Sequence, residues 1–357
     1  MNLSHKEKIL AKGMAGAARF RAVSYSASGI LLLVLLTGGC ARVPAADIPW
    51  ALSRSGTAAA NITGLWWILF GLGTAVFVVV IGLLLYIIFT RRQRLNDDEV
   101  DLRPVNGRPW ILWGGIIIPL IILLAVFFFN MRSLIALASP RPATPLTVEV
   151  IGHRWWWEVR YPDENIVTAN EIRIPVGQPV QFNLTSFDVI HSFWVPQLGG
   201  KMDLNPGEVN STWLQANERG VYRGLCAEFC GLQHARMQFL VVVESEEEFN
   251  TWLVREREPA PEPADELIHR GQQIFLGSAC VYCHTVRGTN ASGDLGPDLT
   301  HLASRLSLAA GILENNRGNL AAWIVDPQHL KPGNLMPPTN LDGEELQALL
   351  AYLETLE

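Results

Sequence analysis

Charged residues are scarce in this chain. Asp, Glu, Lys and Arg make up 17% of its 357 residues, hydrophobic residues make up 49%, and the mean hydropathy is +0.19. This balance argues against a wholly soluble or a disordered protein, so part of the chain is expected to lie in a bilayer. The charge is also divided, because residues 1–144 hold 14 basic and 6 acidic residues whereas residues 145–357 hold 14 and 28. The acidic second half argues against nucleic acid as a partner.

Cysteine is also scarce, and its spacing excludes a disulfide framework. Four of the five cysteines form two close pairs, and Cys40 stands alone. Basic residues precede an apolar run, 30–36, that is far shorter than the roughly 20 residues of a membrane span, so residues 1–40 are predicted to be a signal sequence. Gly38-Gly39-Cys40 resembles a bacterial lipoprotein cleavage site, after which Cys40 would be lipidated. Plain cleavage and an uncleaved N-terminus are the alternatives.

Two long uncharged segments predict a transmembrane hairpin over residues 63–136. Its spans are about 63–90 and 110–130, each long enough to cross the hydrocarbon core. Only Lys and Arg count in the orientation rule, and the loop between the spans holds Arg91, Arg92, Arg94, Arg103 and Arg108. This loop is therefore predicted to be cytoplasmic, with everything after about residue 136 on the periplasmic or outer side of a bacterial inner membrane. The alternative is two buried helices of a soluble protein.

After residue 145, short alternating runs punctuated by Gly and Pro predict an all-β sandwich or barrel over 145–255. Within it, Cys226, Cys230, His234 and Met237 fall on twelve residues, and His191 lies on an upstream strand. Cys, His and a weak Met are the ligands of a blue-copper site, and a second thiolate can bridge two copper ions. The alternative is a disulfide between the two cysteines beside ordinary loop residues.

These residues resemble subunit II of haem-copper cytochrome c oxidases over about residues 60–255. The resemblance is carried by GHRWWW at 152–157, DVIHS at 188–192, KMD at 201–203, PG at 206–207 and CAEFCGLQHARM at 226–237. It implies a cupredoxin-like fold and a binuclear copper A site held by the side chains of His191, Cys226, Cys230, His234 and Met237 and by the backbone carbonyl of Glu228. It also implies that the Glu228 carboxylate reaches a magnesium ion shared with subunit I.

Trp155 matches the aromatic residue of this family through which electrons arrive from cytochrome c. The alternative is core packing, because in a strand Trp155 and Trp157 share one face and Trp156 lies on the other.

The chain departs from many members of the family it resembles at Leu112, where they carry a Glu that opens a proton-uptake path. Leu112 removes that group, and Glu99 and Asp101 in the loop are the remaining candidates.

A charged, Pro-rich stretch, 256–264, predicts a linker, and residues 265–357 predict a helical domain. Cys280-Val-Tyr-Cys283-His284 is the c-type haem attachment motif, in which two thioethers hold the haem and His284 binds the iron. Met336 is the only methionine after His284 and therefore the predicted sixth ligand. A chance occurrence of the motif or a zinc site are the alternatives.

The same segment resembles class I cytochromes c, which are all-α domains whose terminal helices pack together over the haem. Three further histidines in it have no partner motif and are predicted to be surface residues: His269, His301 and His329.

Taken together, the segments resemble subunit II of a caa3-type oxidase, a multidomain membrane protein. The resemblance implies that electrons enter a terminal respiratory oxidase here, from a cytochrome c or similar donor through haem c and copper A to a haem in subunit I. Oxygen reduction and proton pumping would then occur with subunit I and further subunits, since this chain has no bundle of His-bearing spans. The alternatives are a membrane-tethered electron shuttle or copper-delivery protein, and a quinol oxidase subunit II, which lacks the copper ligands and the cytochrome domain.

Both globular segments are acidic. Residues 145–255 hold 8 basic and 14 acidic groups, and residues 265–357 hold 5 and 11. Electrostatic attraction is therefore not expected to dock one on the other, and weak apolar contact around the exposed haem edge and Trp155 is predicted instead.

Overall fold

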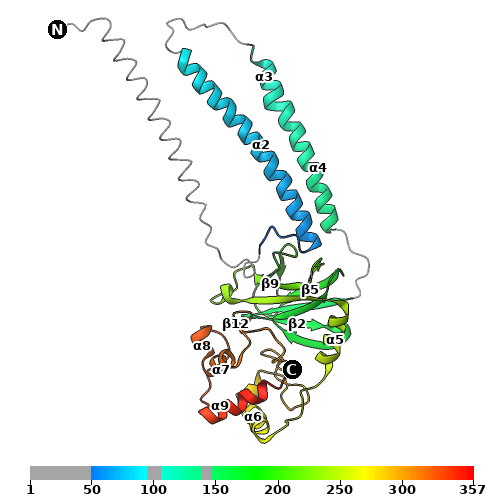
Figure 1. Ribbon diagram of the computed structural model, residues 1–357, viewed down its shortest axis with the longest axis vertical. Helices are drawn as coiled ribbons and strands as arrows, with labels where there is room; N and C mark the ends of the chain where they lie inside the picture. Colours follow the sequence, from blue (N-terminus) through cyan, green and yellow to red (C-terminus); the bar gives the residue numbers. More distant parts are fainter. Residues whose placement is uncertain (1–49, 95–105, 139–145) are drawn as a thin grey trace, which may run out of the picture. The chain divides into compact units, whose positions relative to one another are not determined.

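The computed structural model describes residues 50–94, 106–138 and 146–357. The predicted signal sequence with Cys40 and the candidate proton groups Glu99 and Asp101 lie outside the described residues. Along the chain, the described elements are two apolar helices, then a β domain, then a helical domain (Figure 1).

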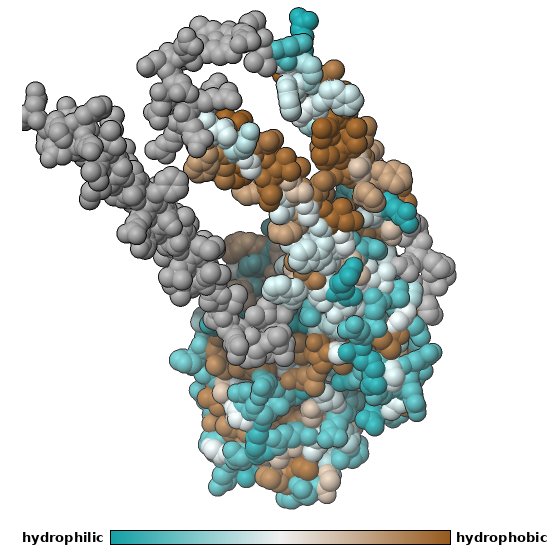
Figure 2. Space-filling view, turned by 45° about the horizontal axis from the view of Figure 1, so that its top comes forward, coloured by the Kyte–Doolittle hydropathy of each residue, from teal (hydrophilic) through white to brown (hydrophobic). Residues whose placement is uncertain are grey.

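Two long helices form the first part. α2 spans Thr57–Arg94, and the second helix runs through α3 (Arg108–Leu112), the π-helical turn η2 (Trp113–Ile117) and α4 (Ile118–Ala138). Thr57–Thr90 and Arg108–Ala138 are each long and apolar enough to cross a membrane, and α2 contacts α4. Their apolar side chains are exposed and give the brown surface of the two helices in Figure 2. Such surface is stable in lipid rather than in water, so the predicted pair of apolar helices is confirmed.

The β domain consists of two five-stranded sheets, with strand orders β3-β2-β1-β5-β8 and β4-β10-β9-β6-β7. The bounds of the first sheet are β1 Thr147–His153, β2 Trp156–Tyr161, β3 Ile166–Ala169, β5 Val180–Ser186 and β8 Asn210–Leu214. Those of the second are β4 Glu171–Pro175, β6 His191–Trp194, β7 Met202–Leu204, β9 Gly220–Cys226 and β10 Gln238–Glu244. Every second residue of β5 is buried, as in a strand with one face on a core. The predicted cupredoxin-like fold is confirmed.

An aromatic core sets the positions of the two strands that carry candidate ligands. Phe239 stacks on Phe193 with ring centroids 4.8 Å apart, and Trp157 packs against Phe239 at 5.1 Å. Gly224 leaves the room for this packing, because a Cβ there would lie 2.1 Å from the Phe239 ring. The packing holds β6 beside β9, with Phe193 opposite Cys226.

Helix α5 (Glu246–Arg257) follows the β domain and extends two residues into the predicted linker. Ser245 and Glu248 form a capping box at its start, which supplies partners for otherwise free N–H groups. The next residues are held on the helical domain, where the Ala260 N–H donates to the Arg287 carbonyl. His301 Nε2 lies 3.1 Å from the Glu258 carbonyl oxygen. His301 is 4% exposed, so its predicted surface position is wrong. The hydrogen bond between its ring and the Glu258 carbonyl holds the ring in this buried position.

The helical domain contains α6 (Glu266–Gly277), η5 (Ala279–Tyr282), α7 (Arg317–Val325), α8 (Pro327–Leu330) and α9 (Gly343–Leu353). The first and last helices pack together, as predicted. Gly271 of α6 permits this close approach, since a Cβ there would lie 2.0 Å from the Ala348 carbonyl oxygen. A two-stranded hairpin, β11 (Ser307–Leu308) and β12 (Leu313–Glu314), is an addition to the predicted all-α content. Its turn places Ala309, Ala310 and Gly311 at φ values of 52°, 62° and 80°.

Candidate functional site

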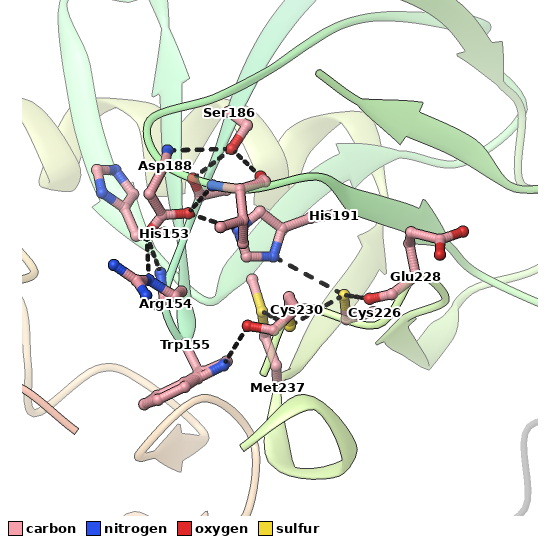
Figure 3. Close-up of polar contacts among 12 residues, drawn as sticks. His153, Arg154, Trp155, Ser186, Asp188, His191, Cys226, Glu228, Cys230 and Met237 are labelled. Atoms are coloured by element: carbon pink, nitrogen blue, oxygen red, sulfur yellow. Dashed lines mark hydrogen bonds and ion pairs between the residues drawn. The ribbon is translucent and has the colours of Figure 1, made fainter. Parts of the chain in front are cut away.

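The structure brings together the side chains predicted to bind copper. His191 begins β6, Cys226 ends β9, and Cys230, His234 and Met237 follow on the loop before β10. Cys226 Sγ lies 3.9 Å from Nδ1 of His191 and 3.8 Å from Sγ of Cys230. Sγ of Cys230 in turn lies 3.7 Å from Nδ1 of His234 and 3.8 Å from Sδ of Met237. Figure 3 shows His191, Cys226, Cys230 and Met237 converging.

The chemistry of this donor set suits soft metal ions. Among the described residues, the ligand atoms of His191, Cys226 and Cys230 form a group within 4.8 Å of one another, and all three residues are buried. The two cysteines are free thiols rather than a disulfide. The backbone carbonyl of Glu228 lies 3.2 Å from Cys226 Sγ, so a sixth donor points to the same place. Thiolate, imidazole, thioether and carbonyl groups together fit a copper pair.

The two thiols are not equivalent electrostatically. The hydrogen bond between the two sulfurs is the main cause that lowers the pKa of Cys226 to about 3, and it raises the pKa of Cys230. The hydrogen bond from His191 adds to the stabilisation of the Cys226 thiolate. A buried thiolate without a cation is unfavourable, so the site favours a bound metal ion that would also deprotonate Cys230.

Asp188 orients His191 through the ring nitrogen that faces away from the cysteines. Its Oδ1 lies 2.9 Å from Nε2 of His191, and it accepts hydrogen bonds from the backbone N–H groups of Val189 (2.6 Å) and Arg154 (2.8 Å) (Figure 3). Burial raises the pKa of Asp188, but these hydrogen bonds outweigh it and lower the pKa to about 2. The carboxylate therefore stays charged and leaves Nδ1 of His191 free for a metal. The sequence interpretation missed this role, although Asp188 stands three residues before the histidine.

The loop of residues 226–237, which carries four of the predicted copper ligands, is called the copper loop below. Of the three consecutive tryptophans, Trp155 is the one with a hydrogen bond to this loop. Its indole N–H donates to the carbonyl of Cys230 at 3.0 Å (Figure 3). Trp157 is fully buried in the core, and Trp156 stacks on His153 with centroids 4.3 Å apart. The predicted alternation of Trp155 and Trp157 on one strand is wrong, because β2 begins at Trp156 and Trp155 lies in the turn before it.

The haem motif folds as a helical turn. The backbone N–H groups of Cys283 and His284 both donate to the Cys280 carbonyl, which places the two thiols and the imidazole on one turn. Nδ1 of His284 lies 2.7 Å from the Pro297 carbonyl oxygen, so it is the protonated nitrogen and Nε2 is free for an iron. Burial lowers the pKa of His284, which favours the neutral ring that binds metals. A Cβ on Gly296 would lie 2.7 Å from this ring, so glycine is needed there. The arrangement fits a c-type haem.

Met336 lies on a loop tied to α8. Gln328 Nε2 donates to the carbonyls of Asn334 and Met336, both at 2.8 Å, and the Met336 N–H donates to Oδ1 of Asn334. Within the described residues, no hydrogen bond or ring contact joins Met336 to His284. The loop conformation is therefore set by its own hydrogen bonds.

Two family models match the chain. One, described as "Cytochrome C oxidase subunit II, periplasmic domain", matches residues 165–245, and the other, described as "Cytochrome c", matches residues 268–357. Cytochrome c oxidase subunit 2 of Alkalihalophilus pseudofirmus is 39% identical over 288 residues, which are 79% of this chain and 83% of that protein. The chain belongs to the cytochrome c oxidase subunit II family.

Other subunit II proteins are also similar to this chain, over most of it or over one domain. Cytochrome c oxidase subunit 2 of Bacillus sp. strain PS3 is 35% identical over 286 residues, 74% of this chain and 80% of that protein. The solved periplasmic domain of cytochrome oxidase subunit II from Bradyrhizobium japonicum is 32% identical and covers 32% of this chain and 96% of that chain, with a TM-score of 0.32.

The family assignment confirms the predicted function. As a subunit II, the chain belongs to an oxidoreductase complex and is the part through which electrons enter a haem-copper oxidase. Its subunit II domain implies copper A, its cytochrome c domain implies haem c, and membership in the complex implies subunit I and further oxidase subunits as partners. The cytochrome c domain argues against the quinol oxidase interpretation, because that relative is expected to lack it.

Proposed function

We propose that the chain passes electrons from an external donor, a cytochrome c or a protein like it, through its helical domain (265–357) to its β domain (145–255) and on to a haem in subunit I. Haem c and copper A, when bound, each accept and release one electron. The observation that carries the proposal is that a copper-type ligand cluster and a c-type haem motif occur in one chain, with Trp155 contacting the copper loop.

The copper ligands of this proposal are the side chains of His191, Cys226, Cys230, His234 and Met237 and the carbonyl of Glu228. The support is their convergence on the two sulfur atoms at 3.2–3.9 Å. On the haem, Cys280 and Cys283 form the thioethers and His284 binds the iron, supported by its free Nε2. Met336 is proposed as the sixth ligand because it is the only methionine beyond His284. A Met/His pair raises an iron potential into the range of electron carriers.

The magnesium ion remains a prediction from the resemblance alone. Its candidate ligand, the Glu228 carboxylate, has a half-exposed side chain and lies 3.8 Å from Nζ of Lys201. The lysine would have to release this carboxylate for a cation shared with subunit I to bind. Metal analysis of the intact complex, with Glu228→Gln as the comparison, tests it.

The proposed topology follows the arginine-rich loop. With 91–108 on the cytoplasmic side of a bacterial inner membrane, the hairpin 63–136 returns the chain to the periplasmic or outer side, where donors are available. The two membrane-type helices agree with this placement. The linker of the proposal begins after Arg257, where α5 ends, and runs to residue 264.

Metal analysis and rapid mixing of the purified complex test the proposal. We expect two coppers from this chain, one covalent haem, a mixed-valence copper signal, and copper reduction after haem reduction at a rate that does not depend on protein concentration. A rate that rises in proportion to concentration would show transfer between molecules and overturn the path.

Loss of the mixed-valence signal in Cys226→Ser is expected, because a hydroxyl is a poor bridge between soft ions. Its retention would contradict the ligand assignment, and absence of a large haem subunit would favour a separate shuttle.

A further inference from the structure

The helical domain is docked on the copper loop by polar contacts. Nζ of Lys331 donates to the Trp155 carbonyl at 2.8 Å. Gln233 Nε2 donates to the Pro332 carbonyl, and Arg236 Nη1 donates to the Leu330 carbonyl, both at 2.6 Å. The contacts from the β domain come from Trp155 and from the copper loop, and those from the helical domain come from residues 330–332, six to four residues before Met336. The two predicted metal sites are thus joined through adjoining segments.

A second group of contacts lies around the β11–β12 hairpin. Glu171, which is 5% exposed, accepts hydrogen bonds from the backbone N–H groups of Leu306 (2.6 Å) and Ser307 (2.9 Å). The Gln238 N–H donates to the Ala310 carbonyl at 3.0 Å. At Trp155 and at the hairpin the two domains are therefore joined by hydrogen bonds, where the sequence predicts weak apolar contact. The sequence prediction uses the summed charge of each domain, whereas individual buried polar groups make these bonds. Apolar contact at the haem edge stays a prediction.

Lys331 is the unusual member of this interface. It is only 2% exposed, and its ammonium donates to the carbonyls of Trp155 and of Ala309, the latter at 3.1 Å. Among the described residues, no carboxylate forms an ion pair with it. Burying an ammonium without a counter-charge is unfavourable, and an apolar side chain of similar length would fill the space without that penalty. The retained ammonium therefore indicates a role other than filling space.

The two carbonyls bound by Lys331 belong to different domains. Trp155 is in the β domain and also donates its indole N–H to the carbonyl of Cys230, a proposed copper ligand. Ala309 is in the turn of the β11–β12 hairpin of the helical domain. A Cβ added at Gly333, two residues after Lys331, would lie 2.9 Å from the side chain of Leu232 in the copper loop. The backbone of this segment is therefore in close contact with the copper loop. A continuous set of contacts thus runs from the Met336 loop through Lys331 and Trp155 to Cys230.

We propose that Lys331 is a positioning residue for electron transfer within the chain: its buried ammonium fixes the Met336 loop against Trp155, and so sets the distance and contact between the haem and copper domains. The inference rests on the proposed function. In the step concerned, one electron passes from the reduced helical domain to the oxidised β domain, and no bond forms or breaks. Lys331 transfers no electron itself.

The test compares Lys331→Met with the parent protein in the intact complex. Methionine keeps an unbranched side chain that is one heavy atom shorter, and it removes the three N–H donors. We expect the rate of copper reduction by the haem to fall at least tenfold, while the methionine-to-iron absorption band and the mixed-valence copper signal persist. Because the substitution also removes a charge, both midpoint potentials are measured, and the fall in rate should exceed the part that their change explains. A rate within twofold of the parent, or a fall fully explained by the potentials, would overturn the proposal.

Hydrogen exchange gives a readout that does not depend on turnover. The Gln238 N–H is bonded across the interface next to Ala309, so its exchange should accelerate in Lys331→Met, whereas the N–H groups of Leu306 and Ser307, held by Glu171, should change less. Unchanged exchange at Gln238 would count against the proposal. Arg270→Met, which removes an exposed charge from α6, is the matched control and should alter neither rate nor exchange.

Two further variants keep the result interpretable. Gln233→Met removes a neutral bond to Pro332 and should slow transfer in the same direction without a change of charge. If Lys331→Met loses its haem or copper, Lys331→Gln, which keeps an N–H donor, decides instead: slower transfer supports the proposal, and parent-like transfer contradicts it. Failure of the proposed function is a different result, namely no copper reduction within the chain in the parent itself.

Discussion

The indole N–H of Trp155 donates to the backbone carbonyl of Cys230 across 3.0 Å, so the proposed point of electron arrival is bonded to the chain of a proposed copper ligand. The other side of the same residue, its carbonyl, accepts from Lys331 of the helical domain. Trp155 therefore lies between the two domains rather than on a free surface. An external donor would meet the helical domain first, in agreement with the proposed order of transfer.

Trp155→Phe should slow copper reduction while leaving the copper signal in place. Phenylalanine keeps an aromatic ring but loses the N–H, and a hydrogen bond of this kind contributes about 1 kcal/mol. Rapid mixing of the intact complex measures the rate, and Trp156→Phe, whose ring stacks on His153 instead, is the control. Equal slowing in both variants would mean that the Trp155 contact has no special role.

Asp188→Asn should weaken copper binding by about 10–100-fold, the usual effect of losing a partner that orients a metal-binding histidine. The amide can no longer provide the charged acceptor that keeps Nε2 of His191 protonated and its Nδ1 free. Competition with a copper chelator gives the affinity. Asp163→Asn, an exposed carboxylate on the 3-10 turn η3 (Pro162–Glu164), should have the parent's affinity; a loss there too would point to a general charge effect.

Met336→His should lower the potential of the haem and slow transfer to copper, with the copper signal intact. Replacement of a thioether by imidazole as axial ligand removes the feature that raises the potential. Redox titration of the haem band checks the shift. An unchanged potential would show that Met336 is not the sixth ligand.

Stability should depend on pH through Lys331. Burial, with a smaller contribution from the Arg236 charge, lowers its pKa to about 7 from an ordinary value near 10.5, and the Cys230 thiol opposes this shift. The folded state therefore binds this proton less tightly than the unfolded state, so its contribution to stability is full above about pH 10.5 and falls as the pH falls towards 7. Between pH 7 and 10, the free energy of unfolding of the parent should thus rise relative to that of Lys331→Met, by up to several kcal/mol. Thermal unfolding at several pH values measures this difference. Parallel pH profiles would show that the ammonium is not desolvated.

Reporter fusions test the topology. A reporter after residue 100 should be cytoplasmic, and one after residue 145 should be outside, because the arginine-rich loop is retained inside. The reverse pattern would separate both metal domains from external donors.

Labelling with fatty acid tests the prediction that Cys40 is lipidated. The label should disappear in Cys40→Ala, and a parent protein without label would instead favour plain cleavage or an uncleaved N-terminus.

Much of the site could be predicted from the sequence because its chemistry is local. Cys226, Cys230, His234 and Met237 lie within one loop, and Cys280, Cys283 and His284 within one helical turn, so short spacing alone places their donor atoms together. The two apolar helices and the alternating strands were also predictable from local sequence, because a long uncharged run indicates a membrane span and an alternation of apolar residues indicates a strand with one buried face.

The tertiary structure alone decided what lies between these local units. The sequence pattern assigned Trp155 to a strand, but pairing between β1 and β2 begins at Trp156 and leaves Trp155 in a turn against Cys230. Likewise, summed charge predicted no polar docking, whereas burial of single groups such as Lys331 and Glu171 in specific hydrogen bonds determines the interface. The physical reason is that such contacts join residues 75 to 176 positions apart, and their energy depends on burial and distance, which no spacing along the chain records.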